Sequence, residues 1–154
     1  MKKIGEYTAR GIVSEEDTTD GNPQKIPLFD GRFDTAYRVV EFRIWGSSFA
    51  GGNDADCVGK LSKNAIGTTG NANFLRADDD NQIAWAASQG DVDHFITAPA
   101  IVDPDNLVVE DLYVYVRSRG TNTFAVNYLV IMEKYEITDW QGALAMARDR
   151  ADGE

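Results

Sequence analysis

Two apolar–polar alternations in the C-terminal half constrain the fold of this chain most strongly. The first begins at Glu110, and its apolar positions, which share one face of an extended strand, are Leu112, Val114 and Val116. The opposite face carries Asp111, Tyr113, Tyr115 and Arg117. A polar stretch over 118–122 is typical of a turn, and a second β-branched and aromatic run covers 123–137. The pattern predicts a long antiparallel hairpin.

Shorter segments with strand character precede this pair. They cover 7–13, 37–45, 57–61, 82–87 and 95–101, and clusters of Gly, Asn, Asp and Ser separate them. In 37–45 the alternation directs Val40, Phe42 and Ile44 inward. The polar stretch 14–25 is typical of a loop. The spacing predicts a mostly-β chain of about 7–8 strands, an antiparallel β-sandwich or jelly roll, and no parallel nucleotide-binding sheet.

One α-helix is expected, at the C-terminus over about 139–151. Thr138 or Asp139 can serve as its N-cap, and strong helix formers follow Trp140. Two interpretations stay open, a helix that closes one end of the domain and an arm that docks on a neighbouring subunit. With no linker and no internal repeat, residues 1–154 are expected to form a single domain.

The charge balance argues against nucleic acid as a partner. The chain has 154 residues with 25 acidic and 15 basic side chains, a formal net charge of −10. Such a surface repels phosphate backbones. Neither a signal peptide nor a membrane-spanning run is expected from the apolar stretches, so we expect a soluble protein made in a reducing cytoplasm.

The sequence predicts no catalytic site, so we expect a protein that is not an enzyme. Its one histidine is His94 and its one cysteine is Cys57, which lies in an expected strand and suits a buried structural thiol. A zinc site of the usual kind would need more of these residues. The acids of 78–80 form the best candidate for calcium, with 54–56 and 103–106 as others, but adjacent acids are typical of turns and caps. No cofactor is therefore expected.

Aromatic side chains and one arginine are the candidate contacts with a protein partner or a glycan. They are Phe29, Arg32, Phe33, Trp85, Tyr113, Tyr115 and Trp140. The first three flank a turn in which Gly31 can supply a positive φ, and core filling is the competing interpretation for the two phenylalanines. The face with Tyr113 and Tyr115 either lies under another sheet or is exposed.

Four segments carry a resemblance to a known group of proteins. Residues 29–40, 81–85, 102–112 and 133–144 resemble small proteins encoded by marine phages. The resemblance implies a jelly-roll protein of the virion, made in the host cytoplasm, that acts as a capsid decoration (cement) or minor capsid component. It also implies a homo-oligomer, a trimer or other symmetric ring, in contact with the major capsid protein. The resemblance supplies no binding residues.

Three hypotheses about function follow. The first is a non-enzymatic structural protein of a phage particle. The second is a carbohydrate- or receptor-binding module of a phage tail or spike, which requires Tyr113, Tyr115 or Trp85 to lie exposed. The third, a metal-dependent jelly-roll enzyme, needs several histidines where this chain has one.

Overall fold

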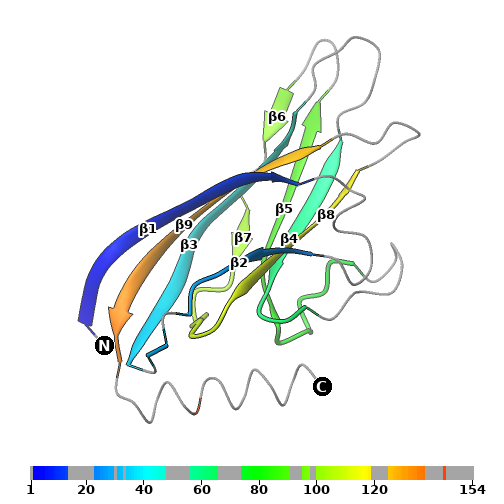
Figure 1. Ribbon diagram of the computed structural model, residues 1–154. Helices are drawn as coiled ribbons and strands as arrows, with labels where there is room; N and C mark the ends of the chain where they lie inside the picture. The colour runs from blue at the N-terminus through cyan, green and yellow to red at the C-terminus, as the bar shows by residue number, and fades with distance from the viewer. Residues whose placement is uncertain are drawn as a thin grey trace.

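The residues that the computed structural model describes form nine strands (Figure 1). The structure describes residues 2–13, 23–29, 31–32, 34–47, 56–65, 74–90, 95–97, 100–118, 125–137 and 144. The strands are β1 (Lys2–Val13), β2 (Gln24–Ile26), β3 (Thr35–Gly46), β4 (Cys57–Ser62), β5 (Gln82–Gly90), β6 (Phe95–Thr97), β7 (Ile101–Val102), β8 (Leu112–Ser118) and β9 (Val126–Glu136). The expectation of a mostly-β chain is confirmed.

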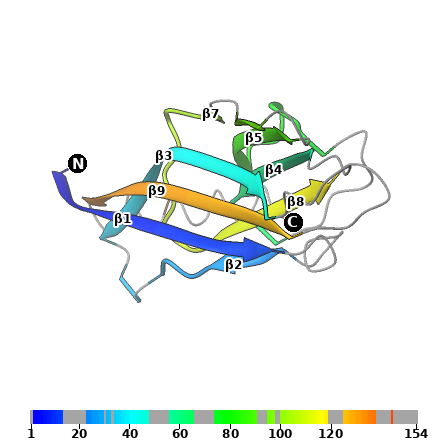
Figure 2. The same ribbon diagram turned by 90° about the horizontal axis from the view of Figure 1, so that it is seen from above.

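The strands form two antiparallel sheets. The first has the order β1-β9-β3, and the second has the order β2-β8-β4-β5-β6, with β7 also paired to β5. Every strand pairing among the described residues is antiparallel. Figure 2 shows β1, β9 and β3 side by side, with β8, β4 and β5 as a separate group of strands.

One apolar core joins the two sheets. In β9 the even-numbered residues from Val126 to Met132 are buried while their odd-numbered neighbours are half-buried, which is the period of a strand with one covered face. These residues, Phe42 and Ile44 of the first sheet belong to the same cluster as Leu61, Val114 and Val116 of the second. Burial of this apolar surface is the main term that favours the fold.

The predicted hairpin between the alternation that begins at Glu110 and the run 123–137 is wrong, although both of its strands exist. β8 pairs with β2 and β4, whereas β9 pairs with β1 and β3, so the two consecutive strands lie in different sheets. Leu112, Val114 and Val116 share one buried face as predicted. The apolar face of β8 packs on the core from the second sheet, and that of β9 packs on it from the first. Alternation alone does not distinguish two strands that face each other across a core from two strands that pair in one sheet.

A bulge in β3 corrects the predicted direction of Val40. Phe42 and Ile44 are fully buried, but Val40 is 40% exposed and Val39 is buried instead. The pairing with β9 shifts register between Val39 and Glu41, and an extra residue at such a point reverses the alternation before it.

Other expectations differ in smaller ways. β1 and β3 are longer than predicted, and β2 lies partly inside the predicted loop 14–25. The predicted strand 95–101 is replaced by β6 and by β7, which begins at its last residue. The predicted helix over 139–151 lies outside the described residues except for Leu144, a helical residue whose side chain is 62% exposed. Among the described residues, no helix is long and apolar enough to cross a membrane.

Candidate functional site

The outer face of the second sheet, which points away from β3, carries part of the predicted contact set. The register places Tyr115 of β8 opposite Lys60 of β4, and Lys60 opposite Trp85 of β5. Side chains opposite one another on antiparallel strands share a face, so these three residues form one row across the sheet. Tyr113 lies on the same face, opposite Ser62 and Lys25.

Lys60 is the most unusual residue of this row because it is a lysine with only 1% of its surface exposed. Its Nζ donates a hydrogen bond of 2.9 Å to the carbonyl oxygen of Phe74. The same atom lies 4.6 Å from the centre of the Phe74 ring and 5.0 Å from that of Tyr115. Lys60 thereby holds Phe74 against the outer face of the sheet.

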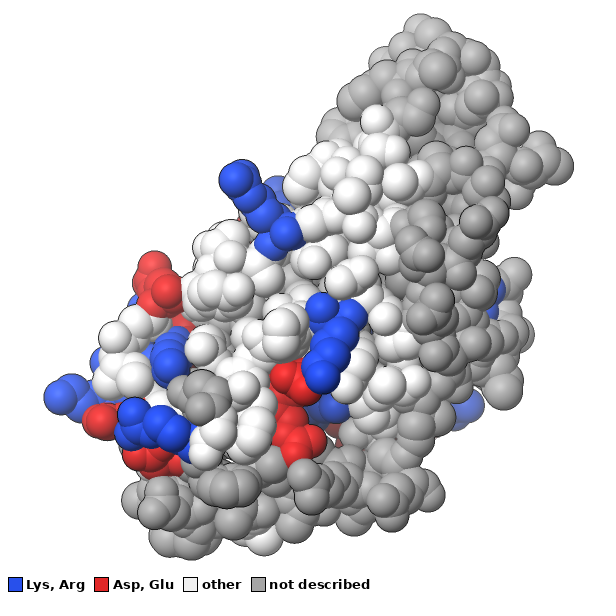
Figure 3. All heavy atoms as spheres, viewed as in Figure 1, with Lys and Arg blue, Asp and Glu red and all other residues white. Residues whose placement is uncertain are grey.

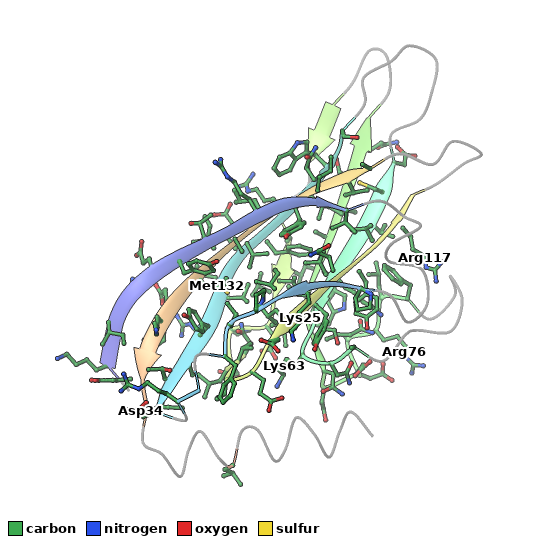
Figure 4. All side chains as sticks on the ribbon, in the orientation of Figure 1. Lys25, Asp34, Lys63, Arg76, Arg117 and Met132 are labelled. Atoms are coloured by element: carbon green, nitrogen blue, oxygen red, sulfur yellow. The ribbon has the colours of Figure 1, made fainter. Side chains whose placement is uncertain are left out.

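Phe74 is the apolar cover of this face. It is 2% exposed, and the guanidinium of Arg117 lies 5.3 Å from its ring centre, in addition to Lys60. Figure 4 shows Arg76 and Arg117 on the side of the molecule that faces away from β1 and β9. The sequence gives a single hint of this arrangement, a lysine inside an otherwise apolar strand.

Tyr115 is buried on this face and does not present its ring to a partner. It is 1% exposed, and its hydroxyl donates to the carbonyl oxygen of Asn64 at 3.3 Å. Burial raises the pKa of its phenol well above the ordinary value. Tyr115 is therefore not available as a surface contact in the single chain, because its side chain is buried on the outer face of the second sheet beside the ammonium of Lys60.

Trp85 and Tyr113 are the predicted contacts that stay partly accessible on this face, since both are half-buried. The Trp85 Nε1 donates to the Gln82 Oε1 at 2.8 Å, and the same oxygen accepts the backbone N–H of Arg76 at 2.9 Å. Ile101, which is opposite Trp85 on β7, is 70% exposed. Apolar surface therefore continues from Trp85 to the edge of the sheet.

The turn around Gly31 has the geometry that its sequence predicts. Gly31 has a φ of 87°, and Phe29 is 41% exposed, so core filling does not describe Phe29. Arg32 donates two hydrogen bonds, of 2.8 and 2.5 Å, to the carboxylate of Asp34. This guanidinium lowers the pKa of Asp34. Phe33 and Trp140 lie outside the described residues.

The acidic residues proposed for calcium serve local structure where the structure describes them. Asp78 accepts two hydrogen bonds from Arg76, which lowers the pKa of that carboxyl. Asp79 accepts from the backbone of Asn81 at 3.0 Å, and Asp103 from that of Asp105 at 3.0 Å. Within the described ranges no three His, Cys, Asp or Glu side chains come together as a metal site. Asp54 and His94 lie outside those ranges.

Cys57 is buried on the core side of β4, as predicted. It is 3% exposed, and burial raises the pKa of its thiol to about 12. A thiol held in this form is a poor nucleophile.

A second surface, which the sequence reasoning did not identify, is the outer face of the first sheet. The register aligns Ile12 with Asn127 and Trp45, and aligns Arg10 with Leu129 and Arg43. The two rows, Ile12–Asn127–Trp45 and Arg10–Leu129–Arg43, form the outer rows of the first sheet. The period-2 alternation of Glu6, Thr8, Arg10 and Ile12 is the signal that could have identified this face.

Charged groups gather at the other end of this face, around Glu133. Its carboxylate accepts from Lys3 at 3.0 Å and from Arg38 at 3.5 Å, and it also accepts the hydroxyl of Tyr135. The hydroxyl of Tyr135 and the ammonium of Lys3 lower the pKa of Glu133. Figure 3 shows this mixture of acidic and basic side chains at the lower left, over the ends of β1, β9 and β3.

The chain was compared with protein-family models, curated proteins and solved structures. None of them matches it.

Proposed function

We propose that this chain is a jelly-roll β-sandwich. Its pairings are those of one long hairpin, with β1 beside β9, β2 beside β8, Val108 beside Tyr37 of β3, and β4 beside β5. When such a hairpin is wound around the core, strands from different parts of the hairpin become neighbours and form further pairs. The pairs β9·β3 and β8·β4 correspond to these further pairs. These pairings are the observation that carries the proposal, since jelly rolls are the double-sheet folds of many capsid and lectin domains.

The function that we propose is that of a non-enzymatic structural protein of a phage virion, a capsid decoration or minor capsid protein without a cofactor. Two features support it, the jelly-roll winding and the resemblance of four segments to marine phage proteins. The chain also has a surface suited to protein contacts, because the outer rows of the first sheet combine Ile12 and Trp45 with Arg10 and Arg43. Its partners would be further copies of itself, in a trimer or other symmetric ring, and the major capsid protein.

Quantitative mass spectrometry of purified particles tests this function. Peptides of this chain are expected in the particles of the phage that encodes it, at a fixed ratio to the major capsid protein that survives repeated density-gradient purification. Their presence in the infected-cell lysate but not in the particles would contradict a virion role.

A carbohydrate-binding module is the second candidate, and the partly exposed pair Trp85 and Tyr113 favours it. Strand-borne aromatic rings of this kind can stack on sugar rings. Binding to a glycan array that is lost in Trp85→Ala and in Tyr113→Ala would support this function. Trp45→Ala, a matched change on the first sheet, should leave such binding unchanged, and an array without any bound glycan would remove the candidate.

A further inference from the structure

The outer edge of β1 is an open strand edge. β1 runs for twelve residues and pairs with β9, and no other strand of the described chain pairs with it (Figures 1 and 2). Alternate backbone N–H and C=O groups of such an edge point outward without a strand partner. Most soluble proteins shorten or interrupt an edge of this length, whereas β1 has one register shift, near its start between Lys3 and Gly5.

We propose that a second copy of this chain pairs with this edge, antiparallel, about a twofold axis that passes through Thr8. Two antiparallel strands related by a twofold axis place opposite one another residues equally distant from the axis, and opposite residues share a face. An axis at Thr8 aligns Glu6 with Arg10 of the second copy, and Arg10 with its Glu6. The edge is therefore complementary in charge to itself.

Other registers lack this complementarity. An axis at Glu6 or at Arg10 would place two like charges directly opposite one another, which is unfavourable. An axis at Tyr7 would oppose Glu6 and Thr8, and an axis at Ala9 would oppose Glu6 and Ile12. The Thr8 axis alone among these five satisfies both charged residues.

The same register also brings Ile12, which is 56% exposed in the single chain, toward the start of β1 of the second copy. Thr8 meets its own copy on the axis, and threonine pairs are favourable on antiparallel strands. The contact would join two three-stranded sheets into one six-stranded sheet and continue the outer rows across both copies.

This inference goes beyond the proposed function and stands without it, because a dimer through β1 does not require a virion. A twofold contact closes on itself, so it predicts an even-numbered assembly rather than the trimer that the resemblance implies.

Charge reversal tests the register. We expect the intact protein to be a dimer by size-exclusion chromatography with light scattering. Arg10→Glu and Glu6→Arg should each raise the dissociation constant by about tenfold or more, because each creates two like-charge pairs. The double variant, Glu6→Arg with Arg10→Glu, should restore the dimer. Arg76→Glu, the same charge change on the side of the molecule that faces away from β1, is the control and should leave the dimer intact.

A disulfide at the axis tests the geometry independently. Opposite residues of antiparallel strands lie within disulfide range, so Thr8→Cys should form a covalent dimer with oxidised glutathione. Ile12→Cys should not, because its two copies would lie about 26 Å apart along the strands. A protein that is monomeric at every concentration would overturn the inference. So would an oligomer that resists both charge reversals and gives no Thr8→Cys cross-link.

Discussion

At the scale of single residues, Asn106 has the clearest structural role. Its Oδ1 accepts the backbone N–H of Val39 at 2.9 Å, and its Nδ2 donates to the backbone carbonyl of Val39 at 3.0 Å. One side chain thus satisfies both backbone groups beside the bulge of β3, where no ladder partner is available on that side. Asn106 is 4% exposed, so water cannot readily replace it.

Asn106→Ala is therefore expected to destabilise the protein. Each buried backbone group of Val39 left without a partner costs about 1–3 kcal/mol. Urea denaturation followed by tryptophan fluorescence measures the loss. Asn127→Ala, at a half-exposed position of β9, should change stability by about 0.5 kcal/mol or less. Equal losses in the two variants would contradict the role given to Asn106.

Cys57 offers a second prediction at this scale. Because burial raises the pKa of its thiol to about 12, almost no thiolate exists near pH 8 in the folded protein. A thiol reagent should react with Cys57 very slowly in buffer and at the rate of a free cysteine in denaturant. Stoichiometric labelling of the folded protein at pH 8 would be inconsistent with this burial.

At the scale of elements, Lys60 connects β4 to the segment that covers the second sheet. Lys60→Met keeps the apolar stem but removes the charged donor to Phe74, a kind of hydrogen bond that contributes about 1.5–3 kcal/mol. Hydrogen exchange by mass spectrometry should show faster exchange over 74–82 in this variant. Lys25→Met, which removes an exposed ion pair with Asp111, is the control and should leave that segment unchanged.

The charged cluster at the end of the first sheet predicts a dependence of stability on pH. The pKa of Glu133 is lower in the folded state than in the unfolded state. Its contribution is therefore fully present above the ordinary carboxyl pKa and is lost as the pH falls through the lowered value. The melting temperature of Glu133→Gln should fall less steeply on acidification than that of the unchanged protein. Asn127→Ala, which changes a neutral side chain of the same strand, is the control and should follow the unchanged protein.

The elements also show what alternation can and cannot predict. The period-2 pattern correctly predicted the buried face of β8 and the burial of Cys57, because the facing of a strand depends on local sequence. It did not predict that β8 and β9 belong to different sheets, because alternation identifies a face and not a partner. The predicted inward direction of Val40 is wrong for a related reason. A bulge reverses which residues of a strand face the core, and a single sequence carries no reliable signal for a bulge.

The candidate surfaces were only partly predictable. The sequence left open whether the face with Tyr113 and Tyr115 is exposed. Trp85 and Tyr113 are half-buried, whereas Tyr115 is 1% exposed and its hydroxyl donates to the carbonyl oxygen of Asn64, far away in sequence. The burial of Lys60 was not predicted, since lysine is ordinarily a surface residue. The edge of β1 was not predicted because an open edge depends on the order of strands in the finished sheet.

At the scale of the whole molecule, two antiparallel sheets share one core and leave their outer faces for contacts. On the second sheet Lys60 holds Phe74 against the outer face, whereas among the described residues no further strand pairs with the outer edge of β1 and the outer rows of the first sheet stay exposed or half-buried. In our account the first sheet is consequently the surface through which the protein assembles.

The measurement that tests this account most directly is the solution mass of the unaltered protein by sedimentation equilibrium over a range of concentrations. The account predicts a discrete, reversible oligomer, a dimer if β1 pairs as proposed, with the same mass in the presence of a calcium chelator. A monomer at all concentrations would contradict assembly through the first sheet.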